Sequence, residues 1–334
     1  MGEFEMMKKT TSALAVAALL GTGAATAATF QVNDDTSLTL SGKVYPAYLD
    51  VKDSNGDSNS SHTDYSRVII AGSHALDNGM TAFANYELRP KNGITNSGSG
   101  VATGQSEANV TEIETRRANL GVSGDFGSVK FGREYTIHDR LIDGLSNYQD
   151  SLAPSTVTDV NAAKRVLNYA SPSINGFQFE VEAQLEDDAN KADTNDNNSG
   201  FAAGVVYDAG VAQFHAAYND GNMVDGNADE DPIIGLAAAF AVNTVDVSAV
   251  YQKDEAATND TDLMALNLGT SVDAIGLQLT LQDVDADGSD SRTEVIGRAA
   301  YSFSDNFYVS AEYRVQDKAK DAGDGYALNA AYTF

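Results

Sequence analysis

The sequence predicts an all-β fold: a transmembrane antiparallel β-barrel of about sixteen strands, with short periplasmic turns and long extracellular loops. Three observations support this prediction. Short runs alternate apolar and polar residues, the breaks between them alternate between short turns and long polar stretches, and the chain opens with an export signal. We expect an N-terminal extension plus cleaved signal peptide at residues 1–27 and the barrel at residues 28–334.

The start of the chain has the composition of a secretory signal. From Met7, "MKKTTSALAVAALLGTGAATA" carries two lysines, an apolar stretch through Leu20 and the small-residue site Ala25-Thr26-Ala27. This pattern predicts cleavage after Ala27. The apolar run is shorter than the ~20 residues that a spanning helix needs, which disfavours a membrane anchor. No later run is long enough either, so the exported protein is a soluble protein or a β-barrel, which satisfies its backbone hydrogen bonds within lipid.

Composition excludes several classes of function. The 334 residues include no Cys, which removes disulfide frameworks, thiol catalysis and cysteine-ligated metals. Asp and Glu number 48 against 21 Lys and Arg, giving a net charge of −27. A nucleic-acid partner is not expected, because the phosphate backbone attracts basic surfaces.

The strand signal is clearest in "FQFEVEAQLE", residues 177–186. One parity carries Phe177, Val181 and Leu185, and the other carries Glu180 and Glu182. The same alternation recurs in "LTLSGKVYPAYL", "VDVSAVYQK", "FYVSAEYRVQ" and the terminal "DGYALNAAYTF". Such runs are typical of strands with one apolar and one polar face.

The breaks between the runs alternate in length. Short ones include "DNG", "DFG", "SING", "AIG" and "SDN", whereas long ones include "DSNGDSNSSHTD", "KNGITNSGSGVATGQSEANV" and "DDANKADTNDNNSG". Short turns at one end and long loops at the other are the arrangement of outer-membrane barrels.

A soluble β-sandwich or β-helix would also alternate, so the contents of the two faces decide between the classes. The apolar face carries aromatic residues near strand ends, which suits the lipid-interface girdles of a barrel. These residues are Tyr48, Tyr86, Tyr301, Phe303, Tyr332 and Phe334. The final strand would leave unpaired backbone groups unless it closed onto another strand.

Several stretches resemble the general diffusion porins of Gram-negative outer membranes. They are "LTLSGKVYPAY", "YSRVIIAGSHALDNGMTAFANYELR", "RRANLGVSGDFGSVKFGREY", "KRVLNYASPSINGFQFEVEAQ" and the terminal "YTF". The resemblance implies a homotrimer of sixteen-stranded barrels in the outer membrane, in contact with lipid and lipopolysaccharide. It implies that the last strand pairs with the first near Leu38–Leu49. It also implies that Phe334 is an assembly signal, read by the barrel-assembly machinery.

The resemblance further implies a third long loop, residues 138–162, that folds inward and narrows the pore. Basic wall residues would face acidic residues of that loop. The residues that match the basic wall are Lys43, Arg67, Arg116 or Arg117, and Lys164 or Arg165; the loop acids would be Asp143 and Asp150. Parity within "RRANLGV" turns Arg117 rather than Arg116 inward, so both choices stay open at this stage.

One stretch resembles a calcium loop. Asp283, Asp285, Asp287 and Glu294 in "DVDADGSDSRTE" fit the spacing D-x-[DN]-x-[DN]-G-x5-E. Oxygen ligands at this spacing can surround Ca²⁺. However, the flanking segments are predicted strands rather than helices, which favours an acidic extracellular hairpin loop without a metal.

The chain is not expected to be an enzyme and no cofactor is expected. It holds no HExxH, GxSxG, P-loop or dinucleotide fingerprint. The predicted function is passive diffusion of small hydrophilic solutes and ions through a water-filled channel, with a preference for cations. The alternatives are a substrate-selective porin and, from another class, a secreted calcium-binding β protein.

Overall fold

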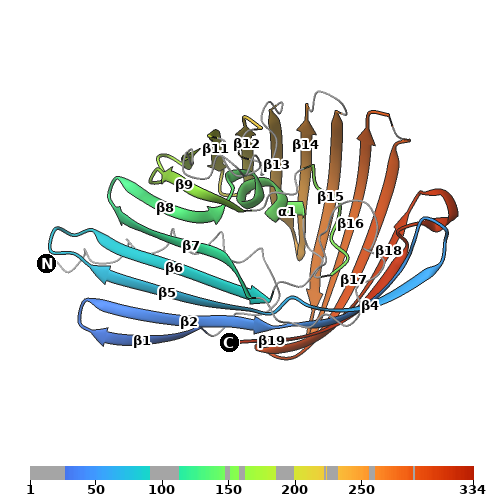
Figure 1. The fold of residues 1–334 in the computed structure, drawn as a ribbon, viewed down its shortest axis with the longest axis horizontal. Helices are drawn as coiled ribbons and strands as arrows, with labels where there is room; N and C mark the ends of the chain where they lie inside the picture. Colours follow the sequence, from blue (N-terminus) through green and yellow to red (C-terminus); the bar gives the residue numbers. More distant parts are fainter. Residues whose placement is uncertain are drawn as a thin grey trace, which may run out of the picture.

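The computed structural model describes residues 27–90, 113–146, 151–157, 162–185, 199–221, 223, 232–255, 260–288 and 290–334. Within them the chain forms one closed antiparallel sheet that encircles a central space (Figure 1). The predicted signal lies outside the described residues, apart from Ala27. No helix in these residues is long and apolar enough to cross a membrane.

Sixteen strands make up the closed barrel over the described ranges, when β2 with β3, and β4 with β5, are each counted as one interrupted strand. The bounds are β2 Thr36–Val44, β3 Pro46–Lys52, β4 Ser58–Asp64, β5 Arg67–Ala75, β6 Thr81–Pro90, β7 Ile113–Gly124, β8 Gly127–Tyr135, β9 Ala162–Ala170, β10 Phe177–Gln184, β11 Gly200–Asp208, β12 Ala212–Asn219, β13 Ile233–Val242, β14 Val245–Asp254, β15 Thr261–Val272, β16 Ile275–Ala286, β17 Arg292–Ser304, β18 Phe307–Gln316 and β19 Gly325–Thr333. The predicted fold class and strand count are confirmed.

The interruption in the first strand falls at Tyr45, immediately before Pro46. Proline has no N–H to donate to a ladder. There the N–H of Tyr45 donates to the side-chain oxygen of Ser66 at 2.9 Å, and the N–H of Tyr65 donates to the carbonyl of Tyr45 at 2.9 Å. These bonds bridge the gap between the two ladders.

The last strand closes the barrel on the first. β19 pairs with β3 from Gly325 opposite Val51 and with β2 through Thr333 opposite Lys43. Phe334 continues this ladder: its N–H donates to the carbonyl of Gly42 at 3.0 Å, and its carbonyl accepts from the N–H of Gly42 at 2.7 Å. The expected pairing of the two ends is therefore present, over Gly42–Val51. An additional short strand, β1 (Ala28–Asn33), pairs with β2 beyond that point.

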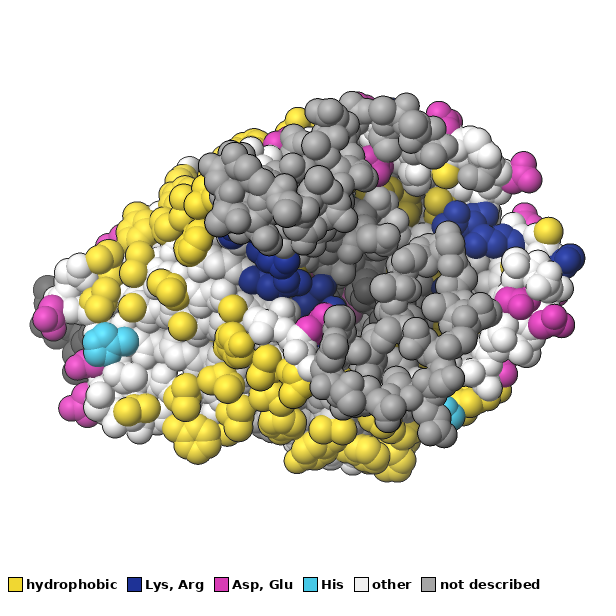
Figure 2. Space-filling model, in the orientation of Figure 1, with side chains coloured by type: hydrophobic (Ala, Val, Ile, Leu, Met, Phe, Trp, Pro, Cys, Tyr) yellow, Lys and Arg dark blue, Asp and Glu magenta, His cyan; other side chains and the backbone are white. Residues whose placement is uncertain are grey.

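The two faces of the barrel are inverted relative to a soluble protein. Large apolar side chains face outward, with Phe179 49% and Leu328 53% exposed, whereas polar groups such as Glu312 and Asn329 are buried inside. Figure 2 shows hydrophobic side chains spread over the outer wall. An apolar outer surface is what a bilayer requires.

The segment between β8 and β9 leaves the wall and enters the barrel. It contains the π-helical turn η1 (Asp139–Asp143), which continues into α1 (Gly144–Ser146) (Figure 1). A single turn, η3 (Ala319–Asp321), lies before β19. We call residues 136–161 the inward loop; it covers nearly the same range as the predicted constriction loop.

Candidate functional site

The root of the inward loop is attached to β10 by two glutamates. The carboxylate of Glu182 accepts a hydrogen bond from the N–H of Ile137, with 2.8 Å between N and Oε1. Arg140 pairs with Glu180 at 2.6 Å and lies 3.6 Å from Glu182. Charge-assisted bonds of this length in a buried setting fix the direction in which the loop enters the lumen.

The helical turns then pack on the inner wall of β11–β15. Ile137, Leu141, Ile142 and Leu145 are buried in one cluster whose wall residues include Ala202, Ala217, Ala237, Ala239, Val250, Leu263 and Ala265. Two wall glycines make the close approach possible. A Cβ on Gly204 would lie 2.5 Å from Leu141, and one on Gly235 would lie 2.5 Å from Ile142. Small wall residues therefore form the seat of the loop.

The far part of the loop is bound to the opposite wall. Leu152 N–H and Ser151 N–H donate to Glu312 Oε2 of β18 at 2.7 and 3.0 Å. Ser155 Oγ donates to Glu294 Oε1 of β17 at 2.8 Å, and Ser155 N–H donates to Gln282 Oε1 at 3.0 Å. The loop thus spans the lumen between β10 and β16–β18, and divides its cross-section.

Two of the predicted wall cations lie side by side on the lumen face. Lys43 of β2 and Arg67 of β5 are cross-strand partners, so their side chains project from the same face. The Lys43 ammonium lies 3.5 Å from the centroid of the Tyr45 ring and 3.2 Å from Tyr308 Oη. These contacts hold the charge against the inner wall.

A β-bulge decides between Arg116 and Arg117. Glu87 pairs with Arg117 while Leu88 pairs with Thr115, so Arg116 is an extra residue in β7. Such a residue breaks the alternation of side chains. Both guanidinium groups lie over the ring of Tyr135, at 5.1 and 5.2 Å from its centroid, and Arg117 also pairs with Glu87 at 3.0 Å. Both arginines therefore face the lumen.

A second bulge changes the assignment of Lys164 and Arg165. Glu134 pairs with Ala163 and Gly132 pairs with Val166, which leaves both cations opposite Arg133. Ala163 and Val166 are buried in the cluster under the inward loop, so alternation turns Lys164 to the outer face. Arg165 has φ 57° and donates from Nε to the carbonyl of Leu185, at 2.7 Å. Lys164 belongs to the lipid-facing surface rather than to the pore wall.

The acidic side of the loop also differs from the expectation. Asp143 is 4% exposed, packed between the loop and the wall, and burial raises the pKa of its carboxyl to about 7. The neighbouring His138 is 1% exposed, its Nε2 lies 3.1 Å from Gln252 Oε1, and burial lowers its pKa. Asp150 lies outside the described residues.

The calcium-loop spacing does not assemble a site. Asp283 and Asp285 lie in β16 with exposed side chains, whereas Glu294 of β17 is buried inside the barrel, where it binds Ser155 and pairs with Arg292 at 2.9 Å. These acids therefore lie on opposite faces of the wall. Over the described ranges, no three His, Asp or Glu side chains are placed to hold a metal ion.

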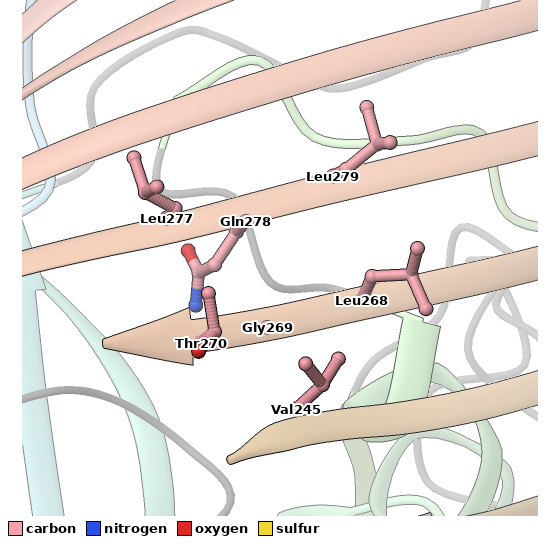
Figure 3. Close-up of a pocket in the computed structure, with 7 residues that line it drawn as sticks. All are labelled: Val245, Leu268, Gly269, Thr270, Leu277, Gln278 and Leu279. Carbon is pink, nitrogen blue, oxygen red and sulfur yellow. The ribbon is translucent and has the colours of Figure 1, made fainter. Parts of the chain in front are cut away.

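A small recess lies elsewhere on the barrel, between β14, β15 and β16. Figure 3 shows Val245, Leu268, Leu277 and Leu279 around it, and none of its seven lining residues is titratable. Leu277, 45% exposed, faces outward, so this recess lies on the apolar outer surface. Figure 2, in contrast, shows one group of Lys and Arg side chains near the middle of the molecule and another toward its right side, with most visible acidic side chains near its edge.

The sequence did not identify the residues that hold the inward loop. Glu182, Glu294 and Glu312 all have buried carboxylates that accept hydrogen bonds from the loop. Their signal was available: each glutamate has the parity of the polar face of its strand. Their partners could not be inferred, because the loop has no periodic pattern.

A closed barrel with an apolar outside, a charged interior and a loop across its lumen defines an outer-membrane channel. The family model "Gram-negative porin" matches residues 11–334, and the chain belongs to this family. A protein named "Monosaccharide porin" from a Halomonas species is 24% identical over 98% of this chain and all of that protein. Outer membrane porin F of Salmonella typhi is 25% identical over 98% of this chain and 87% of its own length.

Solved porin structures share this fold. Salmonella typhi OmpF in complex with daunomycin aligns with a TM-score of 0.72 at 21% identity, over 92% of this chain and all of that one. The anion-selective porin of Comamonas acidovorans aligns with a TM-score of 0.70 at 18% identity, over 90% of this chain and all of that one. The chain is therefore a channel protein of the Gram-negative outer membrane and not an enzyme.

Proposed function

We propose that the chain forms a homotrimeric general diffusion porin that prefers cations at low salt. One observation carries the proposal: the inward loop is bound at both ends across a lumen lined by charged side chains. Such a channel admits small hydrophilic solutes by size rather than by a specific pocket. A trimer form has been solved for OmpT of Vibrio cholerae, which aligns with a TM-score of 0.65. This similarity supports the proposed trimer.

The charge distribution supports the proposed cation preference. Inside the barrel, three glutamates are neutralised by neighbouring cations: Glu87 by Arg117, Glu134 by Lys130 at 2.8 Å, and Glu294 by Arg292. The excess of 48 acids over 21 bases therefore lies largely in the turns and loops at the two mouths. Acidic mouths concentrate cations before they reach the narrow part of the channel.

The basic strip formed by Lys43, Arg67, Arg116 and Arg117 acts in the opposite sense. It favours anions at the narrow part, opposite the inward loop. Salt shortens the reach of fixed charge to about 10 Å at 0.1 M, so the wide mouths lose their influence first. Cation preference should therefore be moderate at low salt and fade as salt rises.

Reversal potentials in planar bilayers under a KCl gradient test this proposal. The wild type should favour K⁺ at low salt, and Arg67→Gln with Arg116→Gln should strengthen that preference. Lys253→Gln is a matched control. Lys253 lies opposite outward-facing Ile234 and Asp262 on the neighbouring strands, so its side chain is on the outer face at the rim rather than on the pore wall. Anion preference of the wild type at low salt would contradict the proposal.

Two variants test the roles of the loop acids Asp143 and Asp150 separately. Asp143→Asn should leave the reversal potential unchanged, because the side chain is buried. Asp150→Asn should shift it toward anions if Asp150 supplies the acidic side of the constriction. An unchanged potential in Asp150→Asn would remove that residue from the site.

Solute selectivity separates the general porin from a substrate-selective one. The Halomonas relative is named a monosaccharide porin, which supports neutral sugars as solutes here. In liposome swelling, the uptake rate should fall smoothly with solute size across monosaccharides and disaccharides. Saturation by one sugar, with exclusion of others of equal size, would favour the selective alternative.

A further inference from the structure

One row of residues on the inner wall, near the periplasmic ends of its strands, holds an aromatic ring. The row crosses five strands through consecutive cross-strand partners, which are Ser37 of β2, Ser73 of β5, Phe83 of β6, Gly121 of β7 and Lys130 of β8. Phe83 has the same parity in β6 as Glu87, whose carboxylate pairs with Arg117 on the lumen face. Cross-strand partners share a face, so the whole row faces the lumen. We call it the Phe83 row.

Uncharged polar groups lie beside this ring. The hydroxyls of Ser37 and Ser73 are 2.8 Å apart in the same row. In the next inner row toward the extracellular side, the amide of Asn85 donates to Asn119 Oδ1 at 3.1 Å. Hydroxyl and amide groups both donate and accept hydrogen bonds, so the surroundings of Phe83 suit a ligand rich in hydroxyls.

The Phe83 ring rests on the wall with one part of its surface. A Cβ on Gly121 would lie 2.7 Å from Cζ of Phe83, so only glycine leaves room for the ring at this point. Covering a glycine with an aromatic ring also supports the sheet. Phe83 is nevertheless only half-buried. The remaining apolar surface faces an aqueous lumen, where contact with water is unfavourable.

The Phe83 row lies on a part of the wall that the helical turns of the inward loop do not occupy. Among the described residues, η1 packs on β12 and β13, and α1 packs on β14 and β15. The far part of the loop is bound to β16–β18. Along β2 and β5, the Phe83 row lies three inner rows to the periplasmic side of Lys43 and Arg67. A solute that passes the basic strip along this wall therefore reaches Phe83 next to hydroxyl and amide groups.

We propose that Phe83 and the polar groups beside it form a weak subsite for the pyranose ring of a neutral sugar; this inference rests on the proposed function. A pyranose has an apolar face of C–H groups and a rim of hydroxyls. The C–H face would cover the exposed part of the Phe83 ring, while the rim hydroxyls bind Ser73 and Asn85. Lys130 pairs with Glu134 at 2.8 Å, so the row offers no net charge and favours a neutral solute over an ion. One aromatic wall without a second wall opposite gives brief residence, which is compatible with diffusion.

Saturation-transfer NMR of the full-length barrel in a sugar-free detergent, titrated with methyl α-glucopyranoside, tests the proposal. Phe83→Leu should raise the Kd about threefold to tenfold, because the flat ring is lost while the apolar cover of Gly121 is kept. Phe83→Tyr should keep the wild-type Kd. Ser73→Ala should raise the Kd about threefold without changing the ring. Phe179→Leu is the matched control, because it removes an aromatic ring that is 49% exposed on the outer surface.

Sorbitol provides the solute control, because this open-chain polyol has hydroxyls but no rigid C–H face. It should bind the wild type no better than the glucoside binds Phe83→Leu. Equal Kd values for the glucoside in the wild type, Phe83→Leu and Ser73→Ala would overturn the subsite, as would equal binding of sorbitol and the glucoside by the wild type. Liposome swelling separates the two proposals. Normal sugar uptake with no effect of these substitutions on binding overturns the subsite alone, whereas absence of sugar uptake by the wild type overturns the proposed function.

Discussion

The carboxylate of Glu182 accepts the N–H of Ile137 at 2.8 Å, and this bond joins the barrel wall to the first residues of the inward loop. The next residue back, Val181, is 42% exposed on the opposite face of the same strand. Val181 therefore faces the outer surface of the barrel, and the adjacent Glu182 faces its lumen.

Substitutions at these two positions should separate barrel stability from loop anchoring. Val181→Arg should lower the free energy of unfolding by roughly 2–4 kcal/mol if the residue lies near the bilayer midplane, and should leave conductance unchanged. Glu182→Leu should cost roughly 1–3 kcal/mol, because it leaves the buried N–H of Ile137 without its acceptor while Arg140 keeps its pair with Glu180. It should also add current noise, because the root of the loop is released.

Urea unfolding of barrels refolded in detergent, followed by single-channel recording, measures both effects. Glu182→Gln serves as the control, since its amide oxygen can still accept the Ile137 N–H. Equal noise in Glu182→Leu and Val181→Arg would contradict the assignment of the anchor.

Phe334 is expected to matter for assembly more than for the finished barrel. Its main chain makes two hydrogen bonds to Gly42, so deletion shortens the closing ladder by one residue. We expect a clear fall in the amount of barrel in the outer membrane, with a smaller change in the stability of the fraction that folds. Quantitative heat-modifiability gels of outer-membrane fractions test this. Unchanged yield after deletion would exclude an assembly signal.

Two side chains in the seat of the inward loop, Asp143 and His138, should make the free energy of seating depend on pH in opposite directions. Burial raises the pKa of Asp143 from 3.8 to about 7, so the seated loop holds this proton more tightly than a released loop. The contribution of Asp143 to the free energy of seating the loop is therefore largest in acid. It falls by on the order of 4 kcal/mol as pH rises from about 4 to about 7. Burial lowers the pKa of His138 below 6.5, so its contribution weakens as pH falls below that value.

Single variants should reveal each dependence separately. His138→Gln should show current noise that rises with pH between about 4 and about 7, and Asp143→Asn should show noise that rises as pH falls below about 6.5. The wild type should change least over the shared window, because the two slopes oppose each other. Single-channel recordings across this pH range provide the measurement. The same direction of change in both variants would contradict the account of the seat.

Alternation alone predicted most of the fold, because a lipid face and a lumen face impose a strict period of two. It failed where an extra residue interrupts the period. Arg116–Arg117 and Lys164–Arg165 were the two ambiguous pairs in the sequence, and the structure has a bulge at each. Alternation counted from one side of a bulge does not apply on the other side, because the extra residue shifts the pattern by one position.

The site was less predictable because it depends on how the inward loop packs. Gly204 and Gly235 lie among small apolar residues of the inner wall, and their meaning appears only with Leu141 and Ile142 against them. Asp143 resembled a pore-facing acid by its position in the loop, yet the helical turn directs it into the seat. Tertiary packing of an aperiodic segment leaves no local pattern in the sequence.

The dependence of single-channel conductance on KCl concentration tests the central claim most directly. A water-filled lumen narrowed by a bound loop should give stepwise current increments whose size grows in proportion to bulk conductivity at high salt, with an excess at low salt, where the acidic mouths concentrate cations. A conductance that saturates at moderate salt would indicate ion binding at a specific site along the path, and would contradict a general diffusion channel.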